Sequence, residues 1–299
     1  MIIPPGFCQR SILTKLGRMA YYTADMAVFP GAVFAGKILP PLVFLHGFGG
    51  GSSAYEWSKV YPAFALDHCI LAPDLVGWGR SEHPERNYLA EDYISTIIEF
   101  LEQTCTEPVT VVASSLTAAL TIRAAIARPD LFKSLILTTP TGLSDFGKDY
   151  TRSFFIQLVK TPIIDRLLYS LGIATSSGIR NFLEQRQFAR PDRVYPEIVE
   201  AYLASAQQPN AEYAALSFVR GDLSFDLALY MPQLKVPTAI MWGKESQFTE
   251  AEVGQRLAYL NPDAVRHFQL LDDCGLTPQL ELPAIAIALI RRFLSSLDS

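Results

Sequence analysis

The chain has 299 residues, 49% of them hydrophobic, and a formal net charge of −5 at neutral pH. Acidic and basic residues alternate without a long run of either sign, which excludes the basic surfaces typical of nucleic-acid or anionic-membrane binding. No segment approaches the roughly 20 apolar residues of a membrane-spanning helix, and the N-terminus lacks the apolar stretch of a secretory signal. The cysteines have no paired spacing, which is typical of reduced thiols. We therefore expect a soluble, cytoplasmic protein with no nucleic-acid partner and no transmembrane segment.

The first predicted elements are two strands at residues 19–25 and 26–31, which we expect to form an antiparallel hairpin. Beyond them, short runs rich in Val, Ile, Leu and Phe alternate with amphipathic stretches, which predicts buried strands followed by helices. This order predicts the α/β class, with a mostly parallel sheet of about eight strands and helices on both faces. The further predicted strands are 41–47, 68–75, 109–114, 134–140, 237–243 and 265–273. The predicted helices are 54–64, 89–104, 116–127, 249–260 and 283–297.

One long segment interrupts the alternation of strands and helices. Between residues 143 and 231 the sequence shows helical periodicity and no convincing strand. We therefore predict a helical cap (lid) at residues 143–232, inserted into a core formed by residues 1–142 and 233–299. Ligands of open α/β sheets bind beyond the carboxyl ends of the strands, where such a cap would cover them. Six apolar side chains could either line a pocket there or attach the cap to the core: Phe154, Phe155, Leu158, Leu167, Leu168 and Tyr169.

The stretch "VTVVASSLTAALTIRAA" at residues 109–125 places two serines between a predicted strand and a predicted helix. A serine on such a sharp turn, called a nucleophile elbow, stands above the sheet edge, with the next backbone N–H groups pointing over it. The turn needs small residues two positions before and after the serine, and Ala113 and Thr117 stand there where glycines are usual. Taken alone the motif is weak, because paired serines after a strand are often a helix cap.

Two neighbouring motifs strengthen it. "VFLHGFGGGSSAYEWSKVYPAF" ends an earlier strand in His-Gly-Phe and a run of glycines, and "APDLVGWGRSEHP" follows the next strand. Together with the elbow these motifs resemble the α/β-hydrolase superfamily, of the lidded esterase, epoxide-hydrolase and haloalkane-dehalogenase kind. The resemblance covers nearly the whole chain outside the cap. It is specific for the fold and not for the substrate or the reaction.

The resemblance implies a role for the serine and for two backbone groups. It places Ser115 at the nucleophile position and assigns the oxyanion hole to the N–H groups of Phe48 and Leu116. It also implies a positive φ at the serine, a strain of about 1–3 kcal/mol.

The two other members of the catalytic triad are replaced at their usual positions. The family places its acid in a "G-x-x-D" turn, and here "MWGKESQF" has Ser246 at that position, with Glu245 one residue early. The family places its histidine in a "G-H-x-x-x-x-E-x-P" run, and here "DDCGLTPQLELP" has Leu276 at that position. Since Gly275 and Glu281 of the same run are present, the frame of this loop is intact.

Other side chains offer little replacement. The chain has four histidines. The resemblance gives His46 a structural role in the oxyanion turn, His68 and His267 belong to strand starts at the opposite end of the sheet, and His83 lies in a predicted surface loop. Asp145 follows the sixth strand, where some relatives carry their acid, but an acid without a base leaves a serine inert.

A pocket is expected over the elbow. We predict an enclosed, largely apolar cavity between Ser115, Phe48, Leu276 and the cap helices, because such cavities are the usual ligand sites of this architecture. The residues expected to contribute to the pocket from below are His46, Gly47 and Ser114.

Two functions remain open at this stage. The first is a non-catalytic or catalytically altered member of the superfamily that binds a small apolar molecule or an unknown protein partner, without cofactor or metal; a scaffold without a pocket is its extreme form. The second is an active esterase-like hydrolase with a relocated base, or a lyase or isomerase that polarises a carbonyl in the oxyanion hole. Ordinary Ser-His-Asp catalysis is not expected in either case.

Overall fold

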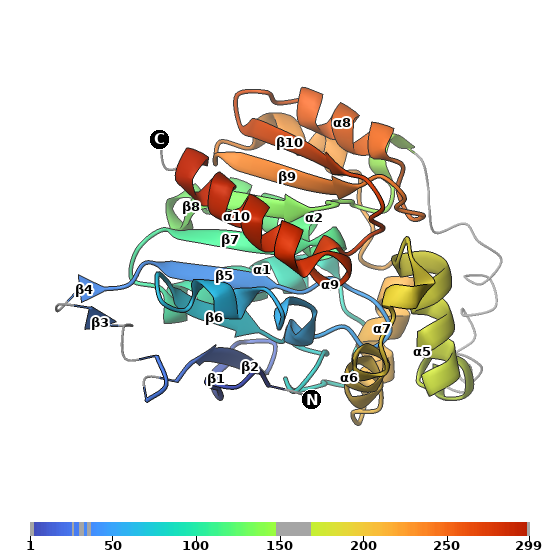
Figure 1. The fold of residues 1–299 in the computed structure, drawn as a ribbon. Helices are drawn as coiled ribbons and strands as arrows, with labels where there is room; N and C mark the ends of the chain where they lie inside the picture. Colours follow the sequence, from blue (N-terminus) through green and yellow to red (C-terminus); the bar gives the residue numbers. More distant parts are fainter. Residues whose placement is uncertain (1–2, 26, 30–32, 35–36, 148–168, 298–299) are drawn as a thin grey trace.

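The computed structural model describes residues 3–25, 27–29, 33–34, 37–147 and 169–297. Eight strands form one sheet in the order β1-β2-β6-β5-β7-β8-β9-β10, in which the last six are parallel (Figure 1). This confirms the predicted mostly parallel sheet of about eight strands. Its strands are β1 (Phe7–Leu13), β2 (Arg18–Ala24), β5 (Pro41–Leu45), β6 (Cys69–Pro73), β7 (Val109–Ser114), β8 (Phe132–Thr138), β9 (Thr238–Gly243) and β10 (Val265–Leu271). A separate pair consists of β3 (Val33–Phe34) and β4 (Lys37–Ile38).

Helices cover both faces of the sheet, with α10 on one face and α1 and α2 on the other (Figure 1). The helices beside the sheet are α1 (Ala90–Thr104), α2 (Ser115–Ala127), α8 (Ala251–Tyr259), α9 (Pro278–Glu281) and α10 (Pro283–Leu297). Two short elements near the candidate site are a 3₁₀ helix, η2 (Ala54–Trp57), and a π-helical turn, η7 (Leu183–Gln187). In the described part of the chain, no helix combines the length and apolarity needed to span a bilayer.

The core is divided between the two faces by the period of two along each strand. In β5, Leu42 and Phe44 join the apolar cluster that contains Ile290 of α10. Val43 and Leu45 alternate with them and join the cluster under α1 and α2. Burial on both faces explains why these strands are continuous apolar runs in the sequence.

The predicted hairpin at residues 19–25 and 26–31 is wrong in its second strand. Strand β2 pairs instead with the upstream β1, antiparallel, from Phe7↔Ala24 to Leu13↔Arg18. The described residues of the predicted partner, Ala27–Phe29, lie in a turn that the Asp25 carboxylate caps by accepting the Ala27 N–H. A turn capped by Asp25 therefore takes the place of the predicted second strand in these residues.

Between β8 and β9 the described residues form helices and one isolated bridge, Leu143↔Phe225. The helices α5 (Ser176–Phe182), α6 (Pro196–Ala206) and α7 (Ala211–Val219) lie together at one end of the sheet (Figure 1). The predicted boundaries of the cap stay a prediction. Five of its six proposed apolar residues lie outside the described ranges. The sixth, Tyr169, is buried and donates its hydroxyl to the carbonyl of Ala206.

Candidate active site

Ser115 occupies a strained turn at the junction of β7 and α2. It is the first residue of α2 and has a φ of 55°, in the left-handed region that only glycine adopts without cost. Ala113 and Thr117 on either side are fully buried. Within the described residues, the Thr117 hydroxyl has no hydrogen-bond partner. The backbone therefore makes the sharp turn although both flanking glycines are replaced.

The turn after β5 approaches this serine closely. A Cβ placed on Gly47 would lie 3.4 Å from the Ser115 Cβ and 3.6 Å from the Ser114 Oγ. Phe48 follows Gly47 directly, so its backbone belongs to a turn that rests on the elbow. Those two distances are ordinary van der Waals distances, so the turn rests in direct contact with the elbow. The oxyanion roles of Phe48 and Leu116 stay predictions.

His46 is buried under this turn and both ring nitrogens are used. Its Nδ1–H donates to the Gly47 carbonyl at 2.7 Å, and its Nε2 accepts the Leu75 N–H at 3.0 Å. Complete burial lowers the pKa of His46 to about 4, so the ring is neutral at pH 7. The lone pair on Nε2 is already engaged and is not directed at Ser115.

The three remaining histidines make contacts elsewhere. His83 Nε2 lies 3.2 Å from the Gly79 carbonyl. His68 directly precedes β6 and packs edge-on against Phe64, and His267, near the start of β10, stacks on Phe293. Because strands β6 and β10 are parallel to β7, their beginnings lie at the end of the sheet opposite to the elbow.

The loops after β9 and β10, where the family would carry its acid and its histidine, touch through their backbones. A Cβ on Gly243 would overlap the carbonyl oxygen of Gly275. Glu245 joins the loops a second time, because its N–H donates to the Cys274 carbonyl at 3.0 Å and its carboxylate accepts the Cys274 N–H at 2.9 Å. The Glu245 carboxylate thus braces the two loops.

Ser246 and Leu276 lie in these two loops. Ser246 is 9% exposed, and its hydroxyl has no hydrogen-bond partner in the described structure. Leu276 is 6% exposed and donates its N–H to the Gln187 carbonyl at 2.8 Å. Glu281 holds the same loop by accepting the Gly275 N–H at 2.9 Å, and burial raises the pKa of Glu281 to about 7.

Asp145, a second candidate acid, is fully buried in a turn of its own. Its carboxylate accepts the Thr141 hydroxyl at 2.7 Å, the Gly142 N–H at 3.0 Å and the Leu227 N–H at 2.9 Å. These bonds attach the segment after β8 to the chain that returns toward β9. The role of the Asp145 carboxylate is therefore structural.

A buried polar network behind the Gly47 turn could not be predicted from the sequence. Glu56 is 1% exposed and accepts the Gly47 N–H at 2.9 Å and the Tyr202 hydroxyl at 3.1 Å. Nearby, Gln279 Nε2 donates to the Ser114 hydroxyl at 3.1 Å. The available signal was one carboxylate inside the apolar run "SAYEW", which a buried 3₁₀ helix turns inward.

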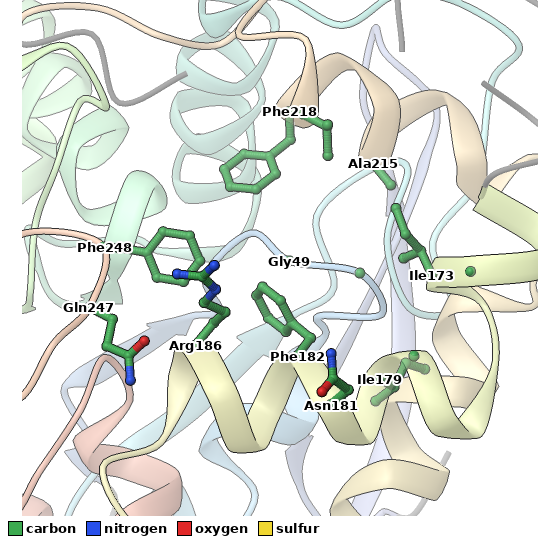
Figure 2. A pocket seen from close by; sticks show the side chains of 14 residues that line it. Gly49, Ile173, Ile179, Asn181, Phe182, Arg186, Ala215, Phe218, Gln247 and Phe248 are labelled. Atoms are coloured by element: carbon green, nitrogen blue, oxygen red, sulfur yellow. The ribbon is translucent and has the colours of Figure 1, made fainter. Parts of the chain in front are cut away.

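A cavity of about 680 Å³ lies beside the glycine-rich turn (Figure 2). Phenylalanine rings from three segments line it, together with the Arg186 guanidinium and two amide side chains. Ser115, Phe48 and Leu276 are not among its lining residues, and neither are the buried His46, Gly47 and Ser114. The lining residues are Gly49, Gly50, Gly172, Ile173, Gly178, Ile179, Asn181, Phe182, Arg186, Ala215, Phe218, Val219, Gln247 and Phe248.

Comparison with known proteins gives consistent matches. The sequence profile described as "Alpha/beta hydrolase family" matches residues 42–288. The chain is 25% identical to the 2-hydroxymuconate semialdehyde hydrolase of Pseudomonas sp. (strain CF600), over 87% of this chain and 88% of that one. It is 23% identical to the 2-hydroxy-6-oxo-2,4-heptadienoate hydrolase of Pseudomonas putida, over 86% and 90%. The structure of the epoxide hydrolase CorEH superposes with a TM-score of 0.75 at 20% identity, over 97% of this chain and 99% of that one.

Proposed function

The chain belongs to the alpha/beta hydrolase family, and from this premise we propose that it binds a small, mainly apolar molecule in the cavity beside the elbow without activating Ser115 through an imidazole. One observation carries the proposal. The loops that would bring an acid and a histidine to the serine are in backbone contact, yet they present Ser246 and Leu276.

The energetic consequence of a missing histidine is large. A serine hydroxyl is a weak nucleophile unless a base takes its proton. Removing the histidine of a triad costs about 10⁶ in kcat, as much as removing the whole triad. An oxyanion hole and substrate binding alone retain about 10³–10⁴ over the reaction in water. With the His46 ring engaged on both nitrogens, ester turnover through an imidazole is not expected here.

The cavity supports a specific kind of ligand. Its walls are mainly aromatic and aliphatic, and Arg186 is the cation among its lining residues. A compound with an apolar body and one carboxylate matches this distribution, because a guanidinium binds carboxylates in a bidentate geometry. The relative named as a 2-hydroxy-6-oxo-2,4-heptadienoate hydrolase takes its name from a compound that carries one carboxylate. We therefore propose an apolar monocarboxylic acid as the ligand, in preference to a protein partner.

The second candidate is an active enzyme with a relocated base, either an esterase-like hydrolase or a lyase that polarises a carbonyl. The comparisons favour it, since the relatives over most of the chain are named as hydrolases. The strained φ of Ser115 favours it as well, because a serine with no task gains nothing from a conformation that glycine adopts freely.

A fluorophosphonate probe separates these candidates, because it reacts quickly only with a serine whose proton is being withdrawn. We expect negligible labelling of the native protein at neutral pH, and no p-nitrophenyl ester hydrolysis above that of the Ser115→Ala variant. Rapid labelling that depends on Ser115 would exclude the inactive site and establish the second candidate. Native mass spectrometry of protein purified from its own host would then identify a co-purified acid.

A further inference from the structure

The buried carboxylate of Glu56 has no role in the function proposed above. We propose that Glu56 is a positioning residue, which couples cap helix α6 to the Gly47–Phe48 turn through the hydrogen bond that it accepts from Tyr202. The proposal rests on the proposed function, because this turn carries the expected oxyanion donor and continues into the cavity wall. It adds a role for the cap that differs from covering the site.

The surroundings of Glu56 are built for a carboxylate. The Gly47 N–H donates to its Oε2 and the Tyr202 hydroxyl to its Oε1. The side chains of Ser52 and Gln279 also lower the pKa of Glu56 as hydrogen-bond partners, yet burial outweighs all of these contacts and raises that pKa. A protonated Glu56 would direct its own hydrogen toward groups that donate, so protonation loosens the network.

Glu56 joins three segments that are distant in the sequence. Tyr202 belongs to α6, and its hydroxyl also accepts a hydrogen bond from Gln187 of η7 at 2.9 Å. The same Gln187 donates to the Thr277 hydroxyl at 3.3 Å. Glu56 itself lies on η2 and holds the N–H of Gly47. A displacement of α6 is therefore transmitted to the turn through one hydroxyl and one carboxylate.

The coupling reaches both the elbow and the cavity. A Cβ on Gly47 would lie 3.5 Å from the Glu56 Oε2 and 3.4 Å from the Ser115 Cβ, so the turn is held between the carboxylate and the serine. Gly49 and Gly50, two and three residues further on, line the cavity. A shift of the Gly47 N–H would therefore move both the cavity wall at Gly49 and Gly50 and the backbone N–H of Phe48.

The experiment follows the Gly47 amide by NMR of the full-length, isotope-labelled protein across a pH titration. We expect the Gly47 signal to titrate with a midpoint above the ordinary glutamate range of about 4.3. The titration should disappear in Glu56→Gln. It should move upward by about one pH unit in Tyr202→Phe, because the lost hydroxyl had stabilised the ionised form.

Nearby titratable groups need to be distinguished. Those around Glu56 in the described structure are Tyr202, Tyr55, the neutral His46 beside the turn, and Asp74, which accepts the Ala54 N–H at the start of η2. Glu56→Gln leaves all four in place, so only a midpoint that this variant abolishes belongs to Glu56. The matched control is Tyr55→Phe, which removes a tyrosine hydroxyl bonded to Glu197 and should not move the midpoint.

A second readout links the network to the cavity, using the apolar anionic probe 1-anilinonaphthalene-8-sulfonate. Its Kd should change by about threefold or more across the Glu56 midpoint in the wild type, and by less in Glu56→Gln. A Gly47 signal that titrates alike in Glu56→Gln, or equal midpoints in Tyr202→Phe and Tyr55→Phe, would refute the proposal. If Glu56→Gln does not fold, the two tyrosine variants decide. If the probe does not bind, the proposed function fails, and the amide titration still tests Glu56.

Discussion

The candidate site has two halves, one at the ends of β5 and β7 and the other at the ends of β9 and β10, and they differ in the side chains that they present. At the ends of β5 and β7, both the strained backbone and the reactive group are present, with Ser115 at a φ of 55° and Gly47 against it. At the ends of β9 and β10, the loops meet at Gly243 and Gly275, and Glu281 accepts the Gly275 N–H. The side chains that these loops carry at the positions assigned to the acid and the histidine are Ser246 and Leu276. Close glycine contacts and carboxylate–amide bonds therefore hold the backbone of these two loops together.

The largest expected effect comes from restoring the second half. In the double variant Ser246→Asp, Leu276→His, the aspartate should orient the imidazole and the imidazole should deprotonate Ser115. We expect hydrolysis of p-nitrophenyl butyrate at least about 10²-fold above the wild type, a small part of the roughly 10⁶ that a histidine is worth. Initial rates at pH 8 provide the measurement.

Each single variant is a control for this gain. Leu276→His lacks its orienting partner, and Ser246→Asp has no base, so both should stay near the wild-type rate. Adding Ser115→Ala to the double variant should abolish the gain. A folded double variant without activity would show that the two pairs of loops do not place Ser115, the aspartate and the imidazole in one catalytic geometry.

Glu281 offers the next largest effect and tests how the second half is held. Burial raises its pKa from the ordinary 4.5 to about 7, so its contribution to stability is complete below pH 4.5 and is lost as the pH rises through 7. Glu281→Gln removes this titration. Between pH 4.5 and 7.5 we expect the wild type to lose about 1–3 kcal/mol of unfolding free energy relative to the variant.

Urea denaturation at several pH values measures this difference. The matched control is Glu245→Gln, since Glu245 braces the same loops from an exposed position. If the unfolding free energies of the wild type and Glu281→Gln changed with pH in the same way, Glu281 would not contribute to holding these two loops.

Arg186 tests the cavity, whose wall includes Gly49 from the first half and Gln247 from the second. We expect Arg186→Gln to weaken 1-anilinonaphthalene-8-sulfonate binding about three- to tenfold, because an exposed cation contributes modestly to holding one anion. The uncharged N-phenyl-1-naphthylamine should bind as before. Fluorescence titration gives both constants.

Arg180→Gln is the matched control for the charge, because Arg180 pairs with Glu184 and is not among the cavity-lining residues. Equal losses in the two arginine variants would mean that general charge, and not a carboxylate site, attracts the probe.

The smallest expected effect concerns the strain at the elbow. Ser115→Gly should be about 1 kcal/mol more stable than Ser115→Ala, because glycine adopts a positive φ without steric cost. At Ser114, whose φ is −118°, the order should reverse, because glycine there only adds freedom to the unfolded chain. Unfolding free energies of the four variants test this, and equal stabilities at residue 115 would mean that the elbow stores no strain.

Much of the fold could be predicted from the sequence, because its main strands are buried on both faces and appear as apolar runs. The elbow was predictable for a similar reason, since a serine between a buried strand and a helix has few other geometries. The pairing of the N-terminal strands was not predictable, because the apolar pattern of residues 26–31 does not indicate whether this segment or another pairs with residues 19–25. The segment that does pair with them, Phe7–Leu13, has mostly exposed side chains and therefore a weaker apolar pattern.

The polar network could not be predicted for a different reason. Glu56, Gln279 and Tyr202 are far apart in the sequence, and the residues around each of them would equally suit an exposed position or an ordinary helix. Only the packing of α6 against the Gly47 turn brings them together. The cavity was expected directly over Ser115, whereas the described one lies beside Gly49 and Gly50, and Ser115 is not among its lining residues.

Helix α6 is also fastened to the core at a second place. The Ser205 hydroxyl donates to the Ser52 carbonyl at 3.1 Å and accepts the Gly79 N–H at 3.0 Å, and a Cβ on Gly51 would overlap the backbone carbonyl of Tyr202. A helix fastened at both places moves only together with the turn at residues 47–51. None of the described lining residues of the cavity belongs to α6, whereas α5 contributes Gly178, Ile179 and Phe182. We therefore expect a bound molecule to leave by local movement of α5, with α6 acting on it only through that turn.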